Sequence, residues 1–105
     1  MKLKLERVIR SPKPEKKYAA IFDLGDGRKK TVHFGATGYG DFIIYSKTEG
    51  KESGLKHRRA YLIRHGRDRG LDDPTTPAAL SYFITWGPHP DLKKNIAFFK
   101  RKFRV

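Results

Sequence analysis

The sequence contains no cysteine, so disulfide bonds and thiolate metal sites are excluded. It also lacks any apolar run close to the ~20 residues that a membrane-spanning helix needs. The first residues alternate charge with leucine, where a signal peptide would carry a continuous apolar stretch. These absences predict a soluble protein that does not span a membrane and is not secreted through a cleaved signal.

Acidic side chains are scarce. Eleven Asp and Glu residues stand against 24 Lys and Arg residues, which leaves a net charge of +13. Self-repulsion of this size destabilises a compact chain unless an anionic partner neutralises it. Nucleic acid is the commonest such partner, because each neutralised phosphate releases counterions. An acidic protein shell or lipid headgroups would also serve. We expect the surplus cations to gather into one contiguous surface.

The composition supports one folded domain over residues 1–105. Apolar residues make up 37% of the sequence and aromatic residues 12%, enough for one modest core and unlike a disordered chain. We find no internal repeat and no low-complexity segment. The chain is therefore predicted to be a single small basic domain.

The N-terminal half is predicted to form strands. Residues 2–9, 18–24 and 28–34 alternate apolar and polar side chains with the period of two that strands require. We expect an irregularity at Arg7–Val8, and a loop where two prolines interrupt residues 11–14. Residues 25–27 supply the Asp-Gly turn of a hairpin.

A glycine-rich corner, residues 33–42, follows the third strand and has the sequence HFGATGYGDF. It is either a buried corner or a binding loop, and we favour a corner that packs Tyr39 and Phe42 against the helices. It lacks the Lys-Ser/Thr pair of a phosphate-binding loop. The apolar residues 41–45 are either a fourth strand or the start of a helix, and residues 46–54 are a mobile connection or a helix start.

The C-terminal half is predicted to be helical. Residues 55–65 carry an apolar stripe of Leu55, Leu62 and Ile63 and end at Gly66. A second helix begins at Thr76-Pro77, buries Leu80, Phe83 and Ile84, and ends at Gly87-Pro88, with Trp86 in the core. A third, after Asp91, has the stripe Leu92, Ile96, Phe99 and Phe103. The fold class is therefore α+β: a small antiparallel sheet of three or four strands packed with about three helices.

Two basic segments are the candidate binding surface. Arginine suits bidentate phosphate contacts, and neighbouring tyrosines could stack on bases. The alternative is a solvated helix face balanced by the carboxylates of residues 49, 52, 68, 72 and 73. Our candidates for nucleic-acid contacts are Lys56, Arg58, Arg59, Arg64, Arg67, Lys100, Arg101 and Tyr39.

The histidines do not form a metal motif. His57 and His65 are eight residues apart, whereas a helical zinc pair uses a spacing of three to five. We expect His33 to be a hydrogen-bonded core residue and the others to lie at the surface. A nuclease site using His65 with Asp41 or Asp68 is a weaker alternative. No catalytic residue, metal or other cofactor is predicted.

Four segments together resemble a known family. They are HFGATGYGDF (33–42), HRRAYLIRHG (57–66), DDPTTPAALSYFITWG (72–87) and DLKKNIAFFKRKF (91–103). The order of these segments is similar to that in an uncharacterised family of small basic proteins encoded by large nucleocytoplasmic DNA viruses. The resemblance covers about residues 17–103. It implies a viral origin and a place in the virion, and it brings no activity or catalytic residues.

We therefore expect a non-enzymatic viral nucleic-acid-binding protein of low sequence specificity, with arginine and lysine contacting phosphates of DNA in preference to RNA. The alternative is a minor capsid or other virion structural protein that docks on acidic capsid proteins. No small-molecule substrate is expected. The expected location is the virion or the host cell interior, whether cytoplasm, viral factory or nucleus.

Overall fold

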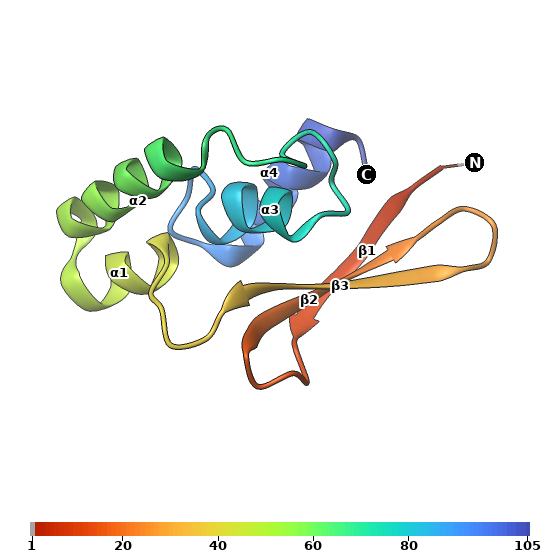
Figure 1. Cartoon of the computed structure of the whole chain (residues 1–105), viewed down its shortest axis with the longest axis horizontal. Coiled ribbons are helices and arrows are strands. Elements are labelled where there is room, and N and C mark those ends of the chain that lie inside the picture. The colour runs from red at the N-terminus through yellow and green to blue at the C-terminus, as the bar shows by residue number, and fades with distance from the viewer. Residues whose placement is uncertain (1) are drawn as a thin grey trace.

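A computed structural model describes residues 2–105, in which a three-stranded antiparallel sheet is followed by the helices (Figure 1). The strands are β1 (Lys4–Arg10), β2 (Lys16–Asp23) and β3 (Lys29–Ala36), in the spatial order β1-β2-β3. The helices are α1 (Phe42–Glu49), α2 (Lys51–His65), α3 (Pro77–Leu80), which continues as a π-helical turn η1 (Ser81–Thr85), and α4 (Leu92–Phe103). The predicted α+β class is confirmed.

The sheet follows the predicted pattern closely. Its register shifts between Leu5 and Arg7, so the irregularity lies just before the predicted position. Side chains at alternate positions of all three strands share the face that packs under the helices, because successive strand residues point to opposite faces. This face contributes Leu5, Ala20, Phe22, Val32 and Phe34, all buried.

The core forms where α3, η1 and α4 cover this face of the sheet (Figure 1). Leu80, Ile84 and Phe99 are fully buried against the strand residues. Thr76 caps α3 with Pro77 in its first turn, as the sequence predicts. The side chain of Asp91 caps α4, at the position where the last helix was expected to begin. The Leu5 amide donates to the Val105 carbonyl, which ties the C-terminus to β1.

Residues 42–49 and 51–54 are helical, which decides between the alternatives left open by the sequence. The Asp41 carboxylate accepts a hydrogen bond from the Ile44 amide and caps α1, so these residues form no fourth strand. Gly50, with φ of +97°, separates α1 from α2. Gly54 lies so close to Ser46 that a Cβ there would overlap its hydroxyl, so the glycine lets the two helices pack.

The predicted apolar stripe of α2 is wrong. Leu55 is 40% exposed and Ile63 is 76% exposed, and only Leu62 of the three is half-buried. The inner face instead carries Gly54, which packs on α1, and Arg58, which bonds to backbone carbonyls. Polar and aromatic contacts therefore orient α2 and leave aliphatic side chains in solvent. Over residues 2–105, no helix combines the length and apolar character needed to cross a bilayer.

Candidate functional site

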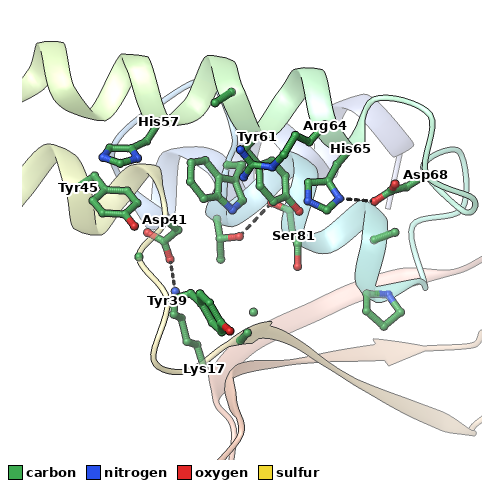
Figure 2. Close-up of a pocket in the computed structure, with 18 of the residues that line it drawn as sticks. Lys17, Tyr39, Asp41, Tyr45, His57, Tyr61, Arg64, His65, Asp68 and Ser81 are labelled. Carbon is green, nitrogen blue, oxygen red and sulfur yellow. Dashed lines mark hydrogen bonds and ion pairs between the residues drawn. The ribbon is translucent and has the colours of Figure 1, made fainter.

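A cleft of about 470 Å³ lies between α2, the glycine-rich corner that precedes α1, and the α3–η1 segment (Figure 2). The elements come from distant parts of the sequence and enclose the cleft from different sides. The side chains that give it chemical character are Lys16, Lys17, Tyr39, Asp41, Tyr45, His57, Tyr61, Arg64, His65, Asp68, Ser81 and Trp86.

Five aromatic rings line one wall of the cleft, and we call them the aromatic row: Tyr45, His57, Trp86, Tyr61 and His65. Tyr61 stacks on Trp86 with centroids 4.3 Å apart and planes 5° from parallel. His65 stacks on Tyr61 at 4.3 Å, and His57 stacks on Tyr45 at 3.6 Å. The Tyr45 and Trp86 centroids are 6.3 Å apart, which joins the two stacks into one row.

Helical spacing explains three of the five rings in the aromatic row. His57, Tyr61 and His65 are four residues apart on α2, so they lie on one face one turn after another. Residues three or four apart on a helix are neighbours, so this spacing could have indicated adjacent rings from the sequence alone. We did not predict a row of rings from it. Trp86 follows η1 and does not lie on α2, so the spacing along α2 could not predict its place in the row.

The opposite side of the cleft is built on the glycine-rich corner. Lys17 on β2 pairs with the buried Asp41 carboxylate at 3.0 Å, which fixes the corner against the sheet. Gly40 passes directly over the Tyr45 ring, and a Cβ there would overlap that ring. Tyr39 stands in solvent, 74% exposed, among the residues that line the cleft (Figure 2).

The corner is therefore only partly the buried corner that we favoured. Phe42 is buried, as expected, whereas Tyr39 is exposed beside the cleft. Gly38 adopts a φ of +84°, a conformation that L-residues with side chains rarely take. The corner thus combines a buried anchor with a solvent-facing ring.

Burial and nearby charges tune the polar groups of the cleft. Burial raises the pKa of the Tyr61 hydroxyl to about 12, and the neighbouring Asp68 carboxylate adds to the effect. The Nδ1 atom of His65 lies 2.7 Å from an Asp68 carboxylate oxygen. His57 Nε2 lies 3.2 Å from the Glu49 carboxylate, and hydrogen bonds from Ser53 and His57 lower the pKa of Glu49.

The histidines agree with the expectations from the sequence in part. His33 is half-buried with its Nδ1 atom 2.7 Å from the Ser11 hydroxyl, as a hydrogen-bonded histidine should be. His57 and His65 lie at the surface as expected, with side chains 41% and 38% exposed, although each ring also stacks on a tyrosine of the aromatic row. Residues 2–105 contain no group of three or more His, Asp or Glu side chains placed to hold a metal ion.

The structure brings two of the eight candidate residues to the cleft, Tyr39 and Arg64. Arg58 is half-buried, and its Nε donates to the carbonyls of Trp86 and Gly87. The other candidates are exposed: Lys56 and Arg59 on α2, Arg67 in the following turn, and Lys100 and Arg101 on α4.

The candidate cations are not neutralised by the carboxylates near them in sequence. Ion pairs within 4.0 Å among residues 2–105 use Lys17, Arg28, Lys29, His57 and His65 as their basic partners. Within this part of the chain, none of the seven basic candidates takes part in such a pair. The charges of the six exposed candidates are therefore available to an external anion, whereas Arg58 already donates to backbone carbonyls.

A family model described as "Family of unknown function (DUF5754)" matches residues 6–65, more than half of the chain. The match extends from β1 to the end of α2 and includes the glycine-rich corner and the three aromatic-row residues of α2. Trp86 and Ser81 lie beyond it. No curated protein and no solved structure matches the chain.

Proposed function

We propose that this chain, which belongs to the DUF5754 family of unknown function, is a non-enzymatic nucleic-acid-binding protein of low sequence specificity. Arginine and lysine side chains would contact phosphates, and the cleft would hold the ring of a base. The observation that carries the proposal is a cleft in which an aromatic row lies beside unpaired cations.

The aromatic lining of the cleft suits nucleic acid because every base has a flat face, although the rings of the aromatic row largely cover one another's faces. Stacking on aromatic side chains contributes about 1–3 kcal/mol per base and tolerates any sequence. Tyr39 adds a ring that is 74% exposed beside the same cleft. Low sequence preference follows, since every base can stack on an aromatic ring and every phosphate carries the same charge.

The cations supply the second half of the proposal. Arg64 lines the cleft, and Lys56, Arg59 and Arg67 continue along α2 and its following turn without a carboxylate of residues 2–105 within 4.0 Å. Each phosphate that such a side chain neutralises adds to the salt dependence of binding, with a slope of about −0.7 per phosphate for single strands and about −0.9 for B-DNA.

Binding measured by fluorescence anisotropy over a series of salt concentrations tests the proposal. We expect affinity to fall steeply with salt, and Arg64→Ala and Arg67→Ala together to reduce the slope of log K against log salt. Arg28→Ala is the matched control, because Arg28 is paired with Asp26 at 2.6 Å in the β2–β3 turn. An affinity that does not change between dilute and physiological salt contradicts the proposal.

A different feature favours the second candidate, a minor capsid or other virion structural protein. The exposed side chains of Leu55 and Ile63, with Leu62, form a shallow apolar hollow flanked by Arg58 and Arg59. An acidic protein surface with an apolar ridge would complement it. In the viral setting that the sequence resemblance implies, such a surface would belong to the capsid.

Separating disrupted virions into genome and shell fractions distinguishes the two candidates. Partition of the protein with the genome supports nucleic-acid binding, and partition with the shell supports the structural role. If Ile63→Glu released the protein from the shell while its binding to nucleic acid was unchanged, the hollow would be the docking surface.

A further inference from the structure

Two hydrogen-bonding groups in the aromatic row have no partner among residues 2–105. The Trp86 indole N–H and the Tyr61 hydroxyl form no side-chain hydrogen bond there, although Trp86 is only 8% exposed and stacks on Tyr61. Tyr and Trp usually find a hydrogen-bond partner when they are buried. Among these residues, the Ser46 hydroxyl is the one side-chain polar atom that is both fully enclosed and without a partner. The Trp86 N–H and the Tyr61 hydroxyl also lack a partner, so they must retain some contact with solvent.

Both residues line the cleft, so their unused donors are available to a ligand there. A flat ring with acceptor atoms on its edge would satisfy them, and the exposed ring of Tyr39 beside the cleft is available to stack on its face. The Tyr61 proton is retained up to high pH, because burial raises the pKa of this hydroxyl to about 12. The hydroxyl therefore acts as a hydrogen-bond donor at physiological pH.

The charges of the cleft fit an anionic group attached to that ring. Asp41 is paired with Lys17. Asp68 is hydrogen-bonded to His65, and its negative charge is balanced there only when the histidine is protonated. Arg64 and Lys16 line the same cleft without a carboxylate of residues 2–105 within 4.0 Å, so their two positive charges outweigh the one negative charge of Asp68. A guanidinium group binds a phosphate through two parallel hydrogen bonds.

We infer that the cleft binds one unpaired nucleobase of a strand, with its acceptor edge at the Trp86 N–H and Tyr61 O–H and its adjoining phosphate at Arg64. The inference rests on the proposed function and assigns its substrate class: single-stranded nucleic acid in preference to duplex. A base inside a duplex has its edge covered by its partner and its faces covered by stacked neighbours. A volume of about 470 Å³ is that of a site for one small ligand.

Trp86 is the single tryptophan of the chain and therefore reports directly on the cleft. We would titrate the full-length protein with an oligodeoxyadenylate strand, with that strand annealed to oligothymidylate, and with inorganic phosphate. The single strand should change the Trp86 fluorescence and bind about tenfold more tightly than the duplex at equal ionic strength. Phosphate alone should leave the fluorescence unchanged.

Two substitutions on α2 test whether the preference for single strands arises in the cleft. Tyr61→Phe keeps the ring and removes the donor, so it should reduce the single-strand preference by several-fold without unfolding the protein. Arg64→Ala should weaken single-strand binding about tenfold. Arg59→Ala is its matched control, because it removes an equally exposed charge from α2 outside the cleft and should lower affinity for strand and duplex equally.

The inference and the proposed function fail in different ways. Equal, salt-dependent binding of strand and duplex with no change in Trp86 fluorescence overturns the inference and leaves the proposed function intact. An identical fluorescence change with inorganic phosphate overturns base recognition. Absence of binding to either nucleic acid at low salt overturns both.

Discussion

Arg58 holds the backbone of Trp86 in place. Its Nε donates hydrogen bonds to the carbonyl oxygens of Trp86 at 3.1 Å and Gly87 at 2.9 Å, and its guanidinium carbon lies 5.6 Å from the centre of the Phe42 ring. One side chain of α2 thus joins the end of η1 to the start of α1. Because Trp86 stacks on Tyr61, this contact also supports the aromatic row.

Replacement of Arg58 by alanine should therefore destabilise the fold. A hydrogen bond from a charged group contributes about 1.5–3 kcal/mol, and its loss leaves two carbonyls without their donor. We expect a loss of about 2–3 kcal/mol in the free energy of unfolding, measured by urea denaturation. Arg59→Ala, one residue further on and exposed, should change stability by less than about 0.5 kcal/mol. Equal effects of the two substitutions would contradict a structural role for Arg58.

Asn95 should be the most sensitive polar residue of the core. Its amide nitrogen donates to the carbonyls of Ile84 (2.7 Å) and His89 (2.6 Å), and its oxygen accepts from the His89 amide at 2.8 Å. Asn95→Ala would leave these buried groups unpaired, at about 1–3 kcal/mol each, so we expect a loss of at least about 3 kcal/mol.

The N-cap of the same helix provides the comparison for Asn95. Asp91→Ala removes the hydrogen bond from the Lys94 amide and should cost about 1 kcal/mol. Chemical denaturation of both variants ranks them, and a smaller loss for Asn95→Ala than for Asp91→Ala would contradict the role of Asn95 in the core.

The orientation of α2 can be tested at Ile63, which is 76% exposed. Ile63→Ser removes an aliphatic side chain that contacts mainly solvent, so stability should change by less than about 0.5 kcal/mol. Leu80→Ala, at a fully buried position, should cost about 2–5 kcal/mol. Thermal and urea unfolding give both values. A loss above about 2 kcal/mol for Ile63→Ser would show that this face of α2 is covered.

Alkaline pH should remove the contribution that Tyr61 makes to the stability of the fold. The pKa of Tyr61 is raised from 10.0 to about 12 by burial, so the folded state retains a proton that the unfolded state releases. The contribution of Tyr61 to stability is therefore complete below pH 10 and is lost as the pH rises towards about 12. The difference in unfolding free energy between the native protein and Tyr61→Phe, measured across this range, should show this loss. A pH-independent difference would contradict it.

Local sequence patterns determined most of the secondary structure. Residues 25–27 close the hairpin because Asp-Gly supplies the backbone angles of a tight turn, and Thr76-Pro77 begins α3 because both residues suit a helix start. The stripe that begins at Leu92 places α4 on the core, since its spacing matches the helical period. These signals lie within a few residues of one another and need no distant partner.

The same reasoning failed for α2. Its aliphatic residues matched a buried stripe, but this helix packs through Gly54 on Ser46 and through Arg58 on the carbonyls near Trp86. The pattern did not reveal these partners, because hydrophobicity alone does not show that a glycine will meet another helix or that an arginine will meet backbone.

Composition and local patterns were enough to predict a basic α+β fold, with a hairpin and helix starts at identifiable residues. That Tyr61, Trp86 and Arg64 line one cleft beside the glycine-rich corner became evident from the folded chain alone. The difference arises from the range of the interactions. Turns and caps depend on neighbouring residues, whereas the cleft depends on packing between segments that are far apart along the chain.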